Sequence, residues 1–145
     1  MKSFLAAFTF TLLSLSLLAQ DATIFGKWKT IDDNTGKVRS IVEIYEKDGK
    51  AYGRIVKLFR TPDQIQDPVC KNCEDDRKGE KVLGLEIIRG MEKDDDEWED
   101  GTILDPESGK IYDCSIWLDE DDPNTLNVRG YIAFFYRTQN WKRVE

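Results

Sequence analysis

The sequence contains no histidine, and this absence removes several kinds of chemistry. Histidine is the commonest general base near neutral pH, the usual partner of a serine or cysteine nucleophile, and a common ligand of zinc and haem iron. Serine-elbow motifs, phosphate-binding glycine loops and dinucleotide-binding fingerprints are also absent. The carboxylates gather in charged turns instead of standing singly in apolar segments, where their pKa values would rise. We therefore expect no catalytic residues, no cofactor and no enzymatic activity.

Basic residues are too few and too scattered to favour an acidic partner. The chain has 21 lysines and arginines against 28 aspartates and glutamates, which gives a net charge of −7. A surface of this charge repels phosphate backbones, and no lysine or arginine cluster stands out to overcome that repulsion. We therefore expect no nucleic-acid partner and no docking on anionic lipid.

Long hydrophobic runs are absent except at the N-terminus. Residues 1–20 carry one charge, on Lys2, and an apolar run of 16 residues that ends at Ala19. A membrane-spanning helix needs about 20 apolar residues, and this run is also interrupted by threonines and serines. A basic start, an apolar centre and a small residue at the end are typical of a secretory signal peptide, with an N-terminal membrane anchor as the alternative. We predict cleavage between Ala19 and Thr23, export to the periplasm or the medium, and no stable membrane insertion of the mature chain.

Amphipathic helical patterns are absent beyond this leader. Short segments rich in valine, isoleucine and aromatic residues are separated instead by turn residues. They predict strands at residues 26–31, 38–46, 51–59, 82–91, 98–104, 110–118, 125–132 and 134–143, of which 82–91 also suits a short helix. The links are of hairpin length apart from an irregular stretch at residues 60–81. Residues 21–145 are therefore predicted to form a single all-β domain, a small antiparallel up-and-down β-barrel of about eight strands.

The strictest alternation lies in residues 110–118. One face carries Tyr112, Cys114, Ile116 and Leu118, and the opposite face is polar apart from Trp117. Side chains of a strand alternate between its two faces, so Cys114 is expected on the inside of the barrel. We predict that Cys114 is a small buried thiol and not a reactive one.

The other two cysteines, Cys70 and Cys73, lie close together in the irregular stretch. Zinc would need more ligands, because one such pair, a distant Cys114 and no histidine make a poor tetrahedral set. A thioredoxin-like redox pair is the alternative, but no βαβ pattern surrounds these residues. Since exported chains meet oxidising conditions, we predict a structural Cys70–Cys73 disulfide.

Two acidic runs, at residues 92–100 and 119–122, raise the question of a calcium site. Their spacing lacks the alternating oxygen ligands, the central glycine and the late bidentate glutamate of an EF-hand loop. Solvated hairpin tips explain both runs more simply. We expect no metal site.

Polar groups interleaved with aromatic residues near the C-terminus are the candidates for ligand binding. Arg137 and Gln139 share one strand face, Arg129 and Tyr131 share a face of the preceding strand, and Tyr112 is the fifth candidate. Guanidinium groups on aromatic-bearing strands can meet the carboxylate of an amphipathic ligand or stack on a ring. The alternative is that these charges face solvent, because alternating strands offer one polar face to water.

The first predicted strand begins with Gly26-Lys27-Trp28, and Arg143 lies on the last one. This pattern resembles the lipocalins and related barrels, in which a glycine and a tryptophan on the first strand meet a basic residue from the last. The resemblance implies that Trp28 plugs one end of the barrel. Gly26 would then permit close approach of the backbone, and Arg143 would lie across the indole.

Longer blocks resemble a narrower group. Residues 26–58, the loop with Cys70 and Cys73, and the segments GLEIIRGM, ILDPESGKIYDC, LNVRGYI and RTQNW are together similar to domain-of-unknown-function family 2147, a family of small exported bacterial proteins. The resemblance implies a lipocalin-like barrel and no established activity. One hypothesis is a barrel that binds a small apolar or amphipathic ligand. The alternative is a non-catalytic envelope interaction or structural module, with a barrel filled by Trp28, Trp117 and other aromatics and with residues 60–81 meeting a protein partner.

Overall fold

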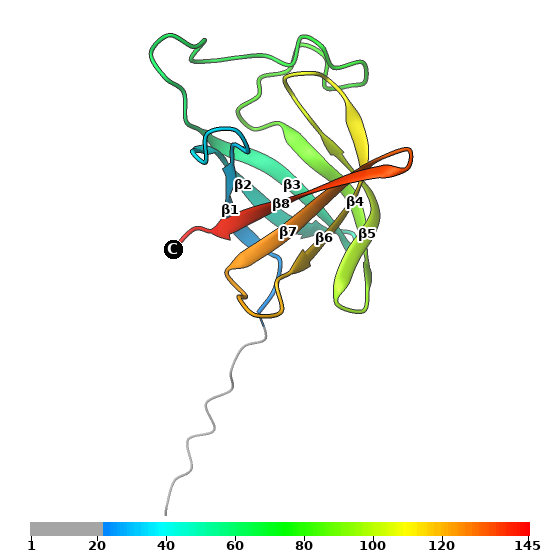
Figure 1. Ribbon diagram of the computed structural model, residues 1–145. Coiled ribbons are helices and arrows are strands. Elements are labelled where there is room, and N and C mark those ends of the chain that lie inside the picture. Colours follow the sequence, from blue (N-terminus) through cyan, green and yellow to red (C-terminus); the bar gives the residue numbers. More distant parts are fainter. Residues whose placement is uncertain (1–21) are drawn as a thin grey trace, which may run out of the picture.

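The computed structural model describes residues 22–145, which form eight antiparallel strands (Figure 1). The strands are β1 (Gly26–Ile31), β2 (Val38–Lys47), β3 (Lys50–Leu58), β4 (Glu86–Asp94), β5 (Glu97–Leu104), β6 (Ile111–Leu118), β7 (Thr125–Ile132) and β8 (Phe135–Arg143). Each strand pairs with the next along the chain, and β8 returns to β1 to close the barrel. The expected all-β up-and-down barrel is confirmed. Residues 22–145 contain no helix long and apolar enough to cross a membrane. The predicted leader, residues 1–20, lies outside the described residues.

The alternation of apolar residues predicted most strand boundaries, and β4 is the exception. The other strands begin and end within one residue of the predicted bounds. β4 starts at Glu86 and not at residue 82, because Val82 and Leu85 form a turn in which the Leu85 N–H donates to the Val82 carbonyl. Gly84 has a φ of 90° there, a value that favours glycine. Val82 and Leu85 are buried by packing of this turn. Their apolar residue types therefore led to the prediction of a strand that begins too early.

The barrel interior is filled by side chains over most of its length. The most deeply buried of them are Trp28, Val42, Ile44, Ala51, Ile88, Met91, Ile116 and Leu126. Cys114 is also buried among them, as predicted. Burial raises the pKa of its thiol to about 12. The part of the interior that these residues fill therefore has the close packing of an ordinary protein core.

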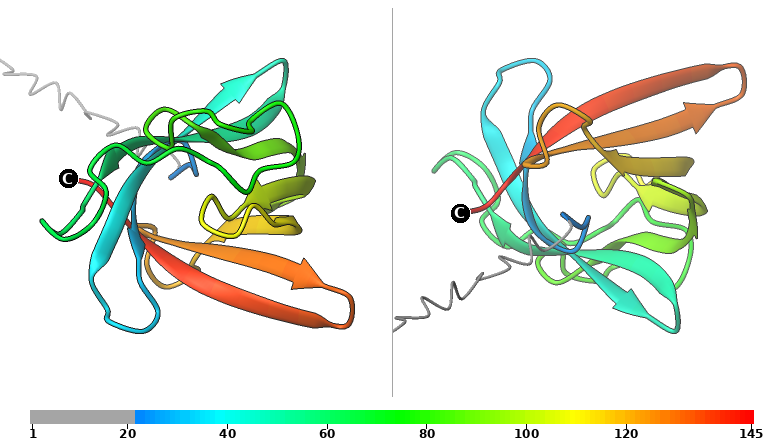
Figure 2. Two further views of the ribbon diagram at one scale, coloured as in Figure 1. Left: turned by 90° about the horizontal axis from the view of Figure 1, so that it is seen from above. Right: turned by 90° about the horizontal axis from the view of Figure 1, so that it is seen from below.

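The up-and-down order gives the barrel two different ends (Figure 2). The capped end carries the β2–β3, β4–β5 and β6–β7 connections and the segment that enters β1. The loop end carries the β1–β2 loop (residues 32–37), the long connection of residues 59–85, the β5–β6 turn (residues 105–110) and the tip of the β7–β8 hairpin.

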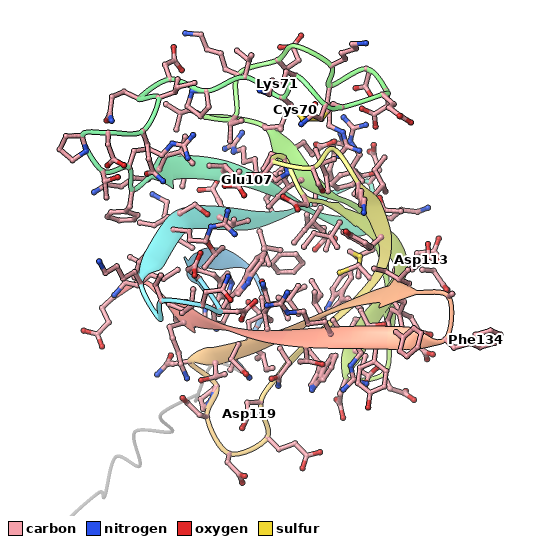
Figure 3. The ribbon with its side chains drawn as sticks, turned by 45° about the horizontal axis from the view of Figure 1, so that its top comes forward. Cys70, Lys71, Glu107, Asp113, Asp119 and Phe134 are labelled. Carbon is pink, nitrogen blue, oxygen red and sulfur yellow. A yellow bond between two sulfur atoms is a disulfide. The ribbon has the colours of Figure 1, made fainter. Side chains whose placement is uncertain are left out.

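The long connection crosses the loop end and is fixed to the β5–β6 turn (Figure 3). Cys70 and Cys73 form the predicted disulfide, and both are buried. Asn72 donates a hydrogen bond from Nδ2 to the Glu107 carbonyl at 2.8 Å. At Gly109 a Cβ atom would collide with the Asn72 carbonyl, so the connection and the turn approach each other more closely than any larger residue allows.

Candidate functional site

The capped end is closed by an aromatic and cationic clasp. The Trp28 side chain is fully buried, and its indole Nε1–H donates to the Ile24 carbonyl at 2.8 Å. The Arg143 guanidinium lies 4.2 Å from the centre of the Trp28 ring. Gly26 has a φ of 122°, and a Cβ atom there would lie 3.5 Å from Arg143 Nη1.

The same arginine ties three chain segments together at this end. Arg143 donates from Nη2 to the carbonyls of Thr23 at 2.7 Å and Pro123 at 3.2 Å, and from Nη1 to that of Phe25 at 3.3 Å. Trp28 is covered on all sides and cannot meet a ligand in this arrangement. Gly26, Trp28 and Arg143 therefore have a structural role, and the candidate binding site lies at the loop end.

The pairing of β1 with β8, which closes the barrel, does not extend to the loop end. Among the described residues, β1 and β8 pair only at Trp28–Arg143 and Lys29–Lys142. Beyond these positions the β7–β8 hairpin and residues 32–37 diverge, which both views of Figure 2 show. The upper parts of β1 and β8 therefore lack the backbone hydrogen bonds that join the other strand pairs.

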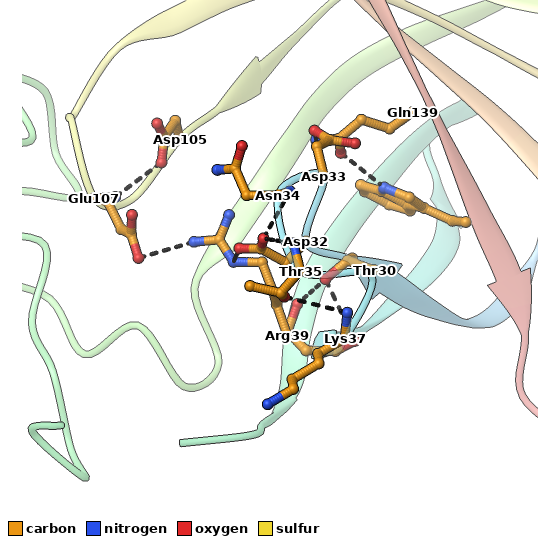
Figure 4. A network of polar contacts seen from close by, with 12 residues as sticks. Thr30, Asp32, Asp33, Asn34, Thr35, Lys37, Arg39, Asp105, Glu107 and Gln139 are labelled. Carbon is orange, nitrogen blue, oxygen red and sulfur yellow. Dashed lines mark hydrogen bonds and ion pairs between the residues drawn. The ribbon is translucent and has the colours of Figure 1, made fainter. Parts of the chain in front are cut away.

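Arg137 and Gln139 project from β8 on the inward side of this unpaired region. Gln139 is opposite Val128, a buried core residue of β7, and Arg137 is opposite Gly130. Both side chains donate to the same Asp33 oxygen, Oδ2, and the distance from Gln139 Nε2 is 2.8 Å. The Trp141 indole donates to Gln139 Oε1 at 3.1 Å, which continues the chain of hydrogen bonds into the core (Figure 4).

Tyr112 lies on the same inward surface. It is paired with Ile103 of β5, and a Cβ atom at Gly130 would lie 3.6 Å from Tyr112 Cβ. Ile103, Tyr112 and Gly130 are only partly buried. One step deeper on two of these strands, Cys114 and Val128 are buried. The inward surface is thus reachable by solvent at the loop end and sealed below it.

The other two candidates, Arg129 and Tyr131, lie on the outer face of β7 and do not line the interior. The Arg129 guanidinium stacks between Trp117 at 4.9 Å and Tyr136 at 4.3 Å. The Tyr131 hydroxyl donates to Ser115 Oγ at 3.3 Å. The pairing of Val128 with Gln139 sets these faces, because it places the even residues of β7 and the odd residues of β8 inside. Trp117 is likewise outside the barrel, so it does not fill the interior.

Asp33 was not predicted from the sequence as part of the site. Residues 32–36 have the composition of a turn, and nothing in that pattern connects them with a strand about a hundred residues further on. Asp32 holds the turn, since its Oδ1 accepts the N–H groups of Asn34 and Thr35 at 2.9 Å each. The hydrogen bond from the Thr35 N–H is the main cause of the lowered pKa of Asp32.

A hollow lies outside the barrel, between the long connection and β4. This open groove of about 470 Å³ is lined mainly by charged residues. Arg77 is buried and donates hydrogen bonds to the Asp75 carboxylate and to the Glu86 carbonyl. The hydrogen bonds that the Arg77 side chain and its backbone N–H donate to Asp75 lower the pKa of that carboxyl to about 2. Arg89 pairs with Asp76 at 2.8 Å. Most of the charges that line the groove therefore already have partners, and we assign no ligand to it.

The fold and the two ends define a lipocalin-like β-barrel. A solved structure with this fold is protein HP1028 from Helicobacter pylori, described as belonging to the lipocalin family. It is similar with a TM-score of 0.70 and 18% identity, over 86% of this chain and 84% of that one. The chain belongs to the family described as "Uncharacterized protein conserved in bacteria (DUF2147)", which matches residues 26–143. No curated protein matches the sequence.

Proposed function

We propose that this protein is an exported, non-enzymatic binding protein that holds a small apolar or amphipathic ligand at the loop end of its barrel. The observation that carries the proposal is the contrast along the inward surface. Side chains are sealed around Trp28 and partly exposed around Tyr112, Gly130 and Gln139. A ligand at the loop end could therefore lie against these inward-facing residues, which water also reaches.

The size of the barrel favours a small ligand that is only partly enclosed. A barrel of eight strands has room for its own side chains or for one small ligand. Here the core side chains occupy the capped end, so a ligand would lie at the loop end, beside the partly exposed Tyr112 and Ile103. An apolar wall with a few convergent polar groups is typical of ligand sites, and Arg137 and Gln139 supply those groups.

Export is part of the proposal. The predicted leader directs the chain out of the cytoplasm. The Cys70–Cys73 disulfide supports this location, because disulfides persist in oxidising compartments and are rare in the cytosol.

Fluorescence of the neutral dye N-phenylnaphthylamine, which rises in apolar surroundings, tests whether the loop end of the barrel binds a ligand. We expect saturable binding that Tyr112→Ser weakens. Tyr131→Ser is the matched control, since it removes the same side chain from the outer face of the adjacent β7. Absence of saturable binding, or equal loss in the two variants, would contradict the proposal.

A protein partner in the envelope is the second candidate, and one surface feature favours it. The tip of the β7–β8 hairpin carries Phe134, which is 100% exposed, beside the exposed Phe135 (Figure 3). Contiguous exposed aromatic residues are typical of contact surfaces. Crosslinking in cells from Phe134, with Lys71 on the long connection as a second position, tests this candidate. This candidate predicts that crosslinking from one of these positions repeatedly traps the same protein. Phe134→Ser or Lys71→Glu should then abolish the capture of that protein.

A further inference from the structure

The donors on β8 form a site for a carboxylate, and Asp33 fills it. Arg137 and Gln139 project in the same direction, two residues apart on one strand, and both hydrogen bond to one carboxylate oxygen. Hydrogen bonds between ionised partners are the strong ones, and a guanidinium matches the geometry of a carboxylate. What the site recognises is therefore a carboxylate group, wherever that group comes from.

The Asp33 carboxylate is held in a way that permits its replacement. The Arg137 side chain is 68% exposed and that of Asp33 is 35% exposed, and ion pairs of this kind contribute little net stability. The β1–β2 loop does not depend on Asp33 for its shape. Asp32 supplies the side-chain hydrogen bonds within it, and the Gly36 N–H donates to the Asp32 carbonyl at 2.8 Å. Because β1 and β8 are unpaired here, no backbone ladder locks the loop against β8.

The surroundings would place the rest of a carboxylate ligand against apolar surface. Arg137 is opposite Gly130, and the inward side of Gly130 faces Tyr112 and Ile103. A tail attached to a carboxylate at Arg137 can therefore lie along these side chains.

From these observations we propose that the ligand is a monocarboxylic acid with an apolar tail, and that its carboxylate displaces Asp33 from Arg137 and Gln139. This inference rests on the proposed function and names the ligand class of that site. Asp33 occupies the site in the free protein and leaves it when the acid binds. Residues 32–37 thereby lose this side-chain contact with β8, and the tail lies along Tyr112 and Ile103, where a neutral apolar ligand would also lie.

Displacement of bound N-phenylnaphthylamine by decanoate and by decanol tests the inference, because the two compounds share a tail and differ in the head group. At neutral pH we expect decanoate to bind about tenfold more tightly than decanol, as one charge-assisted hydrogen-bonding site warrants. In Arg137→Gln this preference should disappear. In Arg129→Gln, which removes the same charge from the outer face of the hairpin, it should remain.

Asp33→Asn supplies a test that a folding defect cannot imitate, since the expected effect is a gain. Removing the competing carboxylate should tighten decanoate binding several-fold and leave decanol binding unchanged. Equal affinities for the two compounds in the wild-type protein, equal losses in the two arginine variants, or no gain in Asp33→Asn would overturn the inference while leaving apolar ligand binding intact. If neither compound displaces the dye, or the dye itself does not bind, the proposed function fails and this inference with it.

Discussion

Replacing Trp28 with alanine tests whether this residue has a structural role at the capped end. The side chain is fully buried at the point where β1 meets β8, and three interactions disappear with it. These are the packing of the indole, its hydrogen bond to the Ile24 carbonyl and its contact with the Arg143 guanidinium. Trp28 is also one of the two positions at which β1 pairs with β8 among the described residues, so the indole lies at the seam that closes the barrel.

The expected cost follows from these three interactions. Large-to-small replacement of a buried tryptophan costs about 3–5 kcal/mol. Leaving the Ile24 carbonyl without its donor adds about 1 kcal/mol, and the lost cation–π contact adds about 1 kcal/mol. Since such losses within one cluster are not additive, we expect the free energy of unfolding to fall by about 4–6 kcal/mol. That is a large part of the roughly 5–15 kcal/mol typical of a domain.

Urea unfolding followed by circular dichroism measures this cost, and Trp117→Ala is its control. Trp117 is the same residue type on the outer face of the barrel, where it is partly exposed, so its replacement should cost about 1 kcal/mol or less. Trp28→Phe should lie between the two, because it keeps a ring beneath Arg143 and loses the hydrogen bond. A folded Trp28→Ala protein of nearly wild-type stability that had lost only dye binding would refute the structural assignment and place Trp28 in the ligand site.

Three further predictions concern other parts of the barrel. Gly101→Ala should destabilise the protein by about 1–3 kcal/mol in urea unfolding, because its Cβ would collide with the Met91 sulfur, whereas Gly130→Ala has space and should be tolerated. The pKa of Asp75 is lowered to about 2, so its contribution to stability is complete above about pH 4 and is lost as the pH falls toward about 2. Between about pH 4 and pH 2, the free energy of unfolding should therefore fall less in Asp75→Asn than in the wild type. An identical fall in both proteins would contradict this role of Asp75. Cys114, whose pKa is raised to about 12, should not react with a chromogenic disulfide reagent until the protein is unfolded.

The sequence predicted the barrel well because the information was local. Period-two alternation and turn residues fixed seven strands to within one residue, and the same alternation placed Cys114 inside. The Cys70–Cys73 disulfide followed from close spacing and a loop context. The start of β4 was mispredicted because burial and strand pairing are separate properties. Val82 and Leu85 are apolar and buried in a turn, and their residue types do not distinguish that turn from a strand.

The candidate site was only partly visible in the sequence, because it depends on contacts between distant segments. Alternation grouped Arg137 with Gln139 and Arg129 with Tyr131, but it could not say which pair faced the interior. The pairing register of β7 with β8 decides this, and it turns Arg129 outward. Asp33 shows a harder case, since a turn aspartate gives no local sign that it will reach a strand near the other end of the chain.

The loop-end carboxylate site is tested most directly by the indole N–H signals of the protein in proton–nitrogen correlation NMR. The sequence has four tryptophans, and two of their indoles report on the two ends. The Trp141 indole donates to Gln139 within the proposed site, and the Trp28 indole donates to Ile24 at the capped end. On titration with decanoate we predict that the Trp141 signal shifts until it saturates while the Trp28 signal stays in place. An unchanged Trp141 signal at saturating dye displacement, or a shift at Trp28 instead, would contradict binding at Arg137 and Gln139.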